Sequence, residues 1–153
     1  MVDAEKRLIE LGIELPPPPT PLGAYVEAVQ TGNLLFLSGT LPAVGRTITY
    51  RGRIGAELDA EQGRAAARQA AMNALAIAKE HLRSLNRITR VVRLGVMLAT
   101  SGENVDQPKV ADGASELFRD VFGAERISVR LLYGVTSLPL NLPVELEVIF
   151  EVA

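Results

Sequence analysis

Residues 143–152, PVELEVIFEV, alternate between apolar and mostly acidic side chains, and this pattern constrains the fold more than any other. A period of two is that of a β-strand with one buried and one open face. The side chains of the buried face are Val144, Leu146, Val148, Phe150 and Val152. Those of the other face are Glu145, Glu147, Ile149 and Glu151. The chain must therefore contain a sheet with a second layer packed against one side.

Two amphipathic helices can supply that layer. Residues 59–85 form the clearest helix, with Asp59 or a neighbour as its N-terminal cap. The residues that recur at helical spacing along its buried face are Ala67, Ala71, Leu75, Ala78 and Leu82. Residues 104–123 predict a second helix, capped at Asn104 or Asp106. Small alanines on a buried face allow a helix to lie close to a sheet.

The N-terminal part of the chain is expected to be an arm followed by a hairpin. Residues 3–12 predict a short helix, and the prolines of PPPPTP (16–21) impose a stiff, extended segment. Residues 1–22 therefore form a helix and a proline-rich arm that packs along the domain. Residues 24–39 alternate and turn at a Thr-Gly-Asn sequence, which predicts a β-hairpin. Residues 47–55 predict a third, weaker strand or an excursion from the sheet.

The order of the elements indicates an α+β fold. Further strands are expected at 87–100, 127–136 and 143–152. The order is then strand pair, helix, strand, helix, strand pair, which fits a mixed β-sheet with two helices on one face. A length of 153 residues is that of one domain with a substantial core, so residues 1–153 are expected to form a single domain.

The second face of the sheet also needs a partner. Apolar residues remain outside the helix-covered set, among them Ile149, Leu132 and Phe36. Apolar surface is stabilised by removal from water. We therefore expect the chain to self-associate and cover this face with another copy of itself.

The composition excludes several classes of function. The chain has no cysteine, which excludes disulfides and thiol catalysis, and one histidine, His81, which excludes a multi-histidine metal centre. The net charge is -2 and the basic residues are scattered, which disfavours nucleic-acid binding. No apolar run approaches the roughly 20 residues that cross a bilayer, and the charged N-terminus lacks the apolar core of a signal peptide. We therefore expect a cytoplasmic protein without a membrane partner.

Two charges interrupt the apolar segment at 128–148, Arg130 and Glu145. Long charged side chains are rarely buried without a partner. If the two strands of this segment face each other, Arg130 lies opposite Ile149 and Glu145 opposite Gly134, an offset of about 13 Å. A direct salt bridge then needs a bulge or a shifted register. The two charges either form that pair or meet a ligand or a neighbouring subunit.

Three segments carry further motifs: LGAYVEAVQTGNLLFLSGTLP, GASELFRDVFG and VRLLYGVTSLPLNLPVELEVIFEV. Together they resemble the Rid family of enamine/imine deaminases, also called the YjgF or L-PSP endoribonuclease family. The resemblance covers residues 20–152 and is strongest to the longer members, which carry GAS-x-L and LPLN-x-PVE-x-E. It implies a chorismate-mutase-like α+β fold and a homotrimer, with the sheets packed into a central barrel and three clefts between subunits.

The resemblance also implies an activity, the hydrolysis of 2-enamine and 2-imino acids to 2-keto acids and ammonia, without a metal or organic cofactor. It places the carboxylate-binding arginine on Arg130 and the motif glutamate on Glu145, and further binding residues on Tyr25, Ser38 and Gly39. A guanidinium grips a planar carboxylate through two hydrogen bonds, and a carboxylate can orient the attacking water. These residue types therefore suit the reaction.

The chain also departs from the family pattern. Leu132 replaces a frequent cysteine and makes the pocket lining bulkier, and Asp112 and Gly113 replace a frequent asparagine near the start of the second helix. An acid at that position would repel a carboxylate substrate. The same clefts in a non-catalytic binding module for a keto acid or related metabolite are the alternative. The ribonuclease activity of the family's older name is disfavoured by the acidic charge balance.

Overall fold

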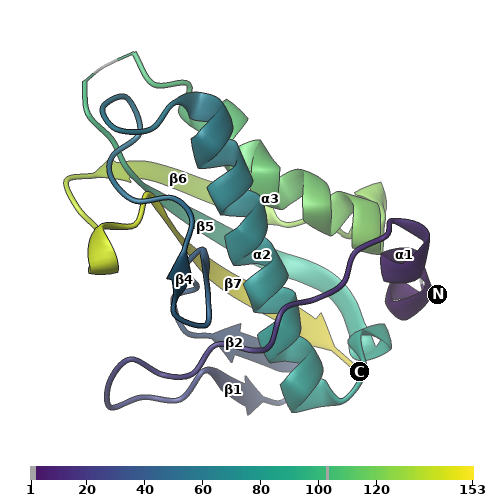
Figure 1. Cartoon of the computed structure of the whole chain (residues 1–153). Helices are drawn as coiled ribbons and strands as arrows, with labels where there is room; N and C mark the ends of the chain where they lie inside the picture. The colour runs from purple at the N-terminus through teal and green to yellow at the C-terminus, as the bar shows by residue number, and fades with distance from the viewer. Residues whose placement is uncertain (1–2, 103) are drawn as a thin grey trace.

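A five-stranded mixed sheet forms the centre of the fold (Figure 1). The structure is a computed structural model, and it describes residues 3–102 and 104–153. The strands of the sheet are β1 (Ala28–Thr31), β2 (Leu34–Leu37), β5 (Ile88–Ala99), β6 (Val129–Val135) and β7 (Val144–Val152). Their order across the sheet is β1-β2-β7-β5-β6, in which β5 and β6 run parallel and the other neighbours antiparallel. The predicted α+β class with a mixed sheet is confirmed.

Two long helices, α2 (Ala60–Leu82) and α3 (Gln107–Phe122), lie side by side on one face of the sheet (Figure 1). The short helix α1 (Ala4–Glu10) packs beside α3, where the Nε of Arg7 donates to the carbonyl of Asp120 at 3.0 Å. The described residues also form three single-turn 3₁₀ helices: η1 (Leu85–Arg87), η2 (Ala124–Arg126) and η3 (Pro139–Asn141). The expected arrangement of two helices on one face is confirmed.

Both long helices begin at caps that the sequence predicts. The Asp59 side chain accepts from the backbone N–H of Gln62, and the Gln62 side chain accepts from the backbone N–H of Asp59, a capping box. Asp106 accepts from the backbone N–H of Lys109 at 3.2 Å. The helix predicted to run to residue 85 ends at Leu82, because Arg83 adopts a left-handed conformation with φ 71°.

The core lies between the two helices and the sheet. The five residues predicted for the buried face of α2 are all buried, and their small side chains bring the helix close to its neighbours. A Cβ at Gly113 of α3 would overlap the backbone oxygen of Arg64, so the two helices cross in near contact. Three rings, Phe118, Phe122 and Phe150, pack with centroids 6.0–6.4 Å apart.

The N-terminal region follows its prediction in most respects. The short helix, the extended proline segment and the hairpin of β1 and β2 are present, with Gly32 and Asn33 at the turn. The segment predicted as a third strand or an excursion is an excursion. Its first residues form β4 (Thr47–Ile48), which pairs with the preceding β3 (Ala43–Val44) in a small separate hairpin that does not join the main sheet.

The expectation that the last two strands face each other is wrong. Strand β5 lies between β6 and β7, so Arg130 pairs with Leu94 and Glu145 pairs with Met97. The link from β6 to β7 passes through η3 and crosses the end of β5, where the Ala99 N–H donates to the carbonyl of Pro143 at 2.9 Å. Sequential strands usually pair, but here the long and largely buried β5 is paired along both edges.

This strand order also corrects the placement of Leu132. The expectation counted it among residues of the second face, but Leu132 pairs with the buried Val96 and packs against the core on the helix side. Ile149 and Phe36 are register partners and do lie on the second face. The exposed apolar residues of that face also include Val29, Val129, Leu131 and Tyr133. The face left open by the helices is therefore rich in apolar side chains.

Candidate active site

Glu145 lies at the edge of a hollow of about 420 Å³ beside the open face of the sheet. Strand β7 turns its alternate side chains to that face, and Glu145 is the first of them. The hollow brings together four of the five residues implied by the family resemblance, namely Glu145, Tyr25, Ser38 and Gly39. Its remaining lining residues are Leu22, Gly23, Leu41 and Pro139.

The environment of Glu145 changes its acidity. The side chain is partly buried among largely apolar neighbours, and this desolvation raises the pKa of Glu145 above its ordinary value. No hydrogen bond or ion pair from residues 3–102 or 104–153 compensates its charge. The carboxylate is therefore free to accept a proton or a hydrogen bond from a ligand.

Gly39 makes room for this carboxylate. A Cβ at Gly39 would overlap Oε1 of Glu145 and lie 3.0 Å from its Cδ. The residue follows β2, where the neighbouring Thr40 pairs with Leu146 through two backbone hydrogen bonds of 2.8 and 2.9 Å. The bridge fixes the backbone of Gly39 beside Glu145. The glycine leaves room for the observed position of the carboxylate, and its backbone angle is not one that other residues avoid.

Ser38 and Tyr25 are held by local hydrogen bonds. The Ser38 hydroxyl donates to the carbonyl of Val26 at 2.5 Å, so its lone pairs remain available to accept a hydrogen bond. The Tyr25 hydroxyl accepts from the backbone N–H of Leu22 at 2.9 Å and closes the loop before β1. Both side chains are thus positioned by the loop that joins the proline arm to the sheet.

Arg130 lies elsewhere. On edge strand β6 it points to the helix side of the sheet, where its Nη1 donates to Oδ1 of Asp112 at 2.7 Å and to the Ser115 hydroxyl at 3.1 Å. Glu145 points to the opposite face of the sheet. Within one chain the structure therefore does not bring Arg130 to the hollow.

The interpretation of residues 128–148 as a pair of facing charges fails for the same reason. The partner of Arg130 is Asp112, the acid at which the sequence departs from the family pattern. The side chains of this pair remain 27% and 43% exposed, so the contact is open to competition from solvent and ligands.

Sequence reasoning missed several residues that shape the hollow and its surroundings. Leu22, Leu41 and Pro139 line the hollow, and Glu27 lines a second cavity beside it. Burial raises the pKa of Glu27 above its ordinary value. The signal that could have found Glu27 is its position in the loop-and-strand motif, two residues after Tyr25.

The described residues offer no arrangement suited to a bound metal ion. Across 3–102 and 104–153, no three His, Asp or Glu side chains gather into a potential metal-binding group. In the same ranges, no helix has the length and apolar character needed to cross a membrane. His81 contacts the side chain of Gln30 at 3.1 Å near the end of α2, away from the hollow.

Comparison with known proteins identifies a family whose model covers almost the whole chain. The family model described as "YjgF/chorismate_mutase-like, putative endoribonuclease" matches residues 5–151. Protein TCP17 of Trypanosoma cruzi is 39% identical over 147 residues, which cover 94% of this chain and 91% of that protein. A 2-iminobutanoate/2-iminopropanoate deaminase of Dermatophagoides farinae is 31% identical over 135 residues, 88% of this chain and 91% of that protein.

The fold has an equally clear match among solved structures. A Shewanella oneidensis crystal structure that shares the endoribonuclease description superposes with a TM-score of 0.93 at 32% identity, over 97% of this chain and 99% of the other. The matched residues, 5–151, contain both long helices, the hollow around Glu145 and all of the sheet except Val152, the last residue of β7. The chain therefore belongs to the YjgF/chorismate mutase-like family, also known as the Rid family.

Proposed function

We propose that the protein hydrolyses reactive 2-enamine and 2-imino acids to 2-keto acids and ammonia, at a site built from two copies of the chain. The observation that carries the proposal is Glu145, an unpaired and partly buried carboxylate in a hollow shared with Tyr25, Ser38 and Gly39. A base whose pKa is shifted toward neutrality transfers protons efficiently near neutral pH. The name of the Dermatophagoides farinae relative supports this class of reaction.

The reaction follows from the groups available. Glu145 takes a proton from water while the water oxygen bonds to the imine carbon, and it passes this proton to the imine nitrogen to give a carbinolamine. The C–N bond of the carbinolamine then breaks as its hydroxyl becomes the new carbonyl. Glu145 takes the hydroxyl proton and passes it to the departing nitrogen, which leaves as ammonia. Water is the only other reactant.

A second copy of the chain would complete the site. Arg130 lies on the edge strand β6, where an adjacent subunit can approach, and β6 also carries the exposed Val129, Leu131 and Tyr133 of the open face. Packing of open faces in a trimer would bury these side chains and bring the Arg130 of one subunit to the Glu145 hollow of the next. The guanidinium would then bind the substrate carboxylate through paired hydrogen bonds.

Asp112 sets a condition on substrate binding. Its carboxylate occupies Nη1 of Arg130, as the carboxylate of a substrate would. A substrate must therefore displace Asp112 or use the other edge of the guanidinium. The same competition applies to the alternative, in which the cleft binds a keto acid without turnover, and activity measurements separate the two functions.

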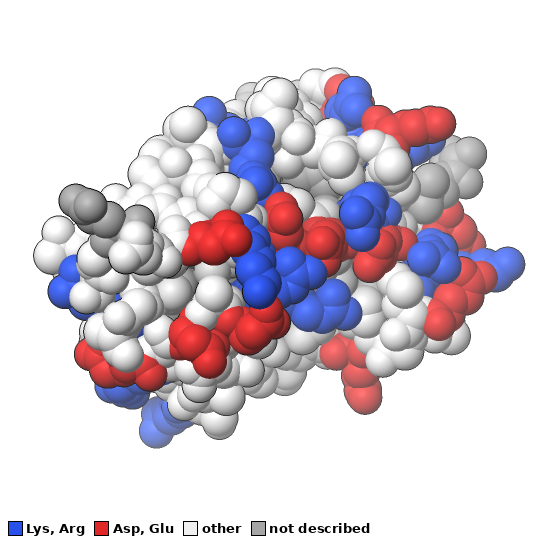
Figure 2. All heavy atoms as spheres, turned by 90° about the horizontal axis from the view of Figure 1, so that it is seen from above, with Lys and Arg blue, Asp and Glu red and all other residues white. Residues whose placement is uncertain are grey.

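The charge distribution argues against RNA as a substrate. On the face seen in Figure 2, acidic and basic side chains are interleaved. Nucleic-acid binding depends on clustered Lys and Arg that neutralise successive phosphates. We therefore propose a small-molecule substrate.

The test couples the protein to an amino-acid oxidase that generates imino acids, and follows the rate of ammonia release. We expect acceleration by the wild type, and a loss of about 10²- to 10⁴-fold in Glu145→Gln, the usual contribution of a general acid–base group. Arg130→Ala should also be inactive, whereas Arg68→Ala, on the exposed side of α2, serves as the matched control. If the protein does not accelerate ammonia release with any of several amino acids, the proposed hydrolase activity is refuted. A ligand-induced rise in melting temperature would then support the non-catalytic binding module.

A mixing experiment tests the shared site. Arg130→Ala and Glu145→Gln chains are unfolded together and refolded, so that subunits mix at random. If each site takes its two residues from different chains, about a quarter of the sites are intact and activity returns. No recovery would show that the two residues do not meet across a subunit interface.

A further inference from the structure

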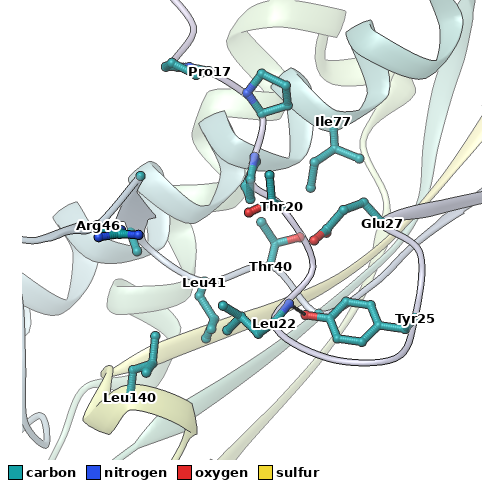
Figure 3. A pocket seen from close by; sticks show the side chains of 15 residues that line it. Pro17, Thr20, Leu22, Tyr25, Glu27, Thr40, Leu41, Arg46, Ile77 and Leu140 are labelled. Carbon is teal, nitrogen blue, oxygen red and sulfur yellow. Dashed lines mark hydrogen bonds between the residues drawn. The ribbon is translucent and has the colours of Figure 1, made fainter.

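A second cavity, of about 350 Å³, lies next to the Glu145 hollow and is not used by the proposed hydrolysis. It is enclosed by the proline arm, by Ile77 of α2 and by the loop that leads to β3 (Figure 3). Leu22, Tyr25, Gly39 and Leu41 line both cavities and form the wall between them. The volume lies within the range of pockets that bind small molecules.

The polar groups of this cavity converge on one spot. Figure 3 shows the Glu27 carboxyl and the Thr40 hydroxyl pointing toward each other, with Ile77 on one side and Leu22 and Leu41 on the other. Glu27 forms no ion pair with a described residue, and its partial burial desolvates the carboxylate. Arg46, the other charged residue of the lining, lies on the opposite side of the cavity (Figure 3).

The spot offers acceptors and lacks donors. The buried Thr40 hydroxyl donates its proton to the carbonyl of Ser38 at 3.2 Å, so its lone pairs remain for a ligand. The Glu27 carboxylate contributes further lone pairs. A primary ammonium is the complement of such a spot, because it carries three N–H donors, a positive charge and no acceptor.

The walls of this cavity determine which chemical character the rest of the ligand can have. Pro17, Pro18 and Pro19 cover one side of the cavity, and the aliphatic side chains of Leu22, Leu41 and Ile77 contribute most of the remainder. Such walls bind an apolar chain. A carboxylate on the ligand would also be repelled by Glu27.

We propose that this cavity is a binding site for a small primary amine with an apolar body, held by its ammonium between Glu27 and Thr40. The site is separate from the Glu145 hollow, and its occupation does not require the hydrolase activity. It assigns a role to the proline arm, which would form the cover over the apolar part of the ligand.

The experiment compares two probes of equal length, n-hexylamine, which is an ammonium at pH 7.5, and 1-hexanol, which is neutral. Titrations followed by ¹H–¹⁵N chemical shifts give both the affinity and the place of binding. We expect n-hexylamine to bind more tightly than 1-hexanol and to shift the amide signals of Glu27, Thr40 and Ile77. Glu27→Gln should weaken n-hexylamine binding by about tenfold or more, the usual effect of a charge-assisted hydrogen bond.

Two variants sharpen the result. Glu125→Gln removes the same charge at an exposed position outside the cavity and should leave the affinity unchanged. Thr40→Val preserves the shape of the side chain and removes the acceptor, so it should weaken the amine severalfold and leave 1-hexanol unaffected. Equal binding of both probes, equal effects of Glu27→Gln and Glu125→Gln, or shifts confined to the Glu145 hollow would each overturn the proposal.

Discussion

Phe150 and Ile149 are neighbours on β7 but lie on opposite faces of the sheet and meet different surroundings. Phe150 is fully buried and contacts Phe118 and Phe122 beneath the helices, whereas Ile149 lies on the open face beside Phe36. The same division separates Glu145 from Arg130. The helix-covered face holds the core, and the open face and its edges carry the unpaired apolar side chains and the candidate chemistry.

The largest expected effect is on the covered face. Phe150→Ala should lower the free energy of unfolding by about 3–5 kcal/mol, because it leaves a cavity among three packed rings. Ile149→Ala should cost about 1 kcal/mol or less in the isolated chain, where that residue is partly solvated. Urea denaturation of both variants at a concentration that favours monomers measures the contrast. Similar losses in the two variants would refute the division between the faces.

The next effect concerns the hollow. Gly39→Ala should reduce kcat/KM about tenfold or more, because the new Cβ displaces the Glu145 carboxylate. The fold should be little affected, since the overlapping atom ends a side chain that can turn away. Gly32→Ala, at a turn with open space, is the control for a glycine substitution and should retain activity despite its positive φ. Full activity in Gly39→Ala would show that the reaction does not depend on the position of the Glu145 carboxylate.

A smaller effect is expected at Asp112. Asp112→Asn should tighten the binding of a 2-keto acid by about three- to tenfold, because it removes the carboxylate that competes for Arg130 while keeping a hydrogen-bonding side chain. Isothermal titration with pyruvate measures the change. Asp120→Asn, on the same helix but away from Arg130, is the charge-matched control. Weaker binding in Asp112→Asn would indicate that the acid positions Arg130 and does not compete with the ligand.

The smallest expected effect is on how the stability of the protein depends on pH. Folding raises the pKa of Glu145 above its ordinary value of 4.5, so the folded state binds its proton more readily and the charged form opposes folding at neutral pH. Glu145→Gln should therefore stabilise the protein at pH 7 by on the order of 0.5 kcal/mol, a figure kept small because solvent still reaches the group. The gain should vanish as pH falls below about 4.5, where both folded and unfolded Glu145 are protonated.

Thermal melts of Glu145→Gln and wild type from pH 4 to 8 follow this difference. Glu125→Gln, at an exposed position, should show no comparable trend. A stabilisation of Glu145→Gln that grows toward acid pH would contradict the sign of the shift and with it the desolvation of the carboxylate.

The sequence by itself determined the local structure and the faces of its elements. The alternation along β7 separates buried Val148 from exposed-side Ile149, and the caps at Asp59 and Asp106 begin the two long helices, because both depend on interactions within a few residues. The hairpin segment at 24–39 also brings Tyr25, Ser38 and Gly39 together, since all three lie within it.

Only the tertiary structure decided which strands are neighbours and therefore where the two charges lie. A short link between β6 and β7 is compatible with a hairpin or with a crossing over the end of β5, and the local sequence does not distinguish them. Packing of the long and largely buried β5 between β6 and β7 chose the second arrangement. As a result Glu145 faces the hollow on one side, while Arg130 faces Asp112 on the other.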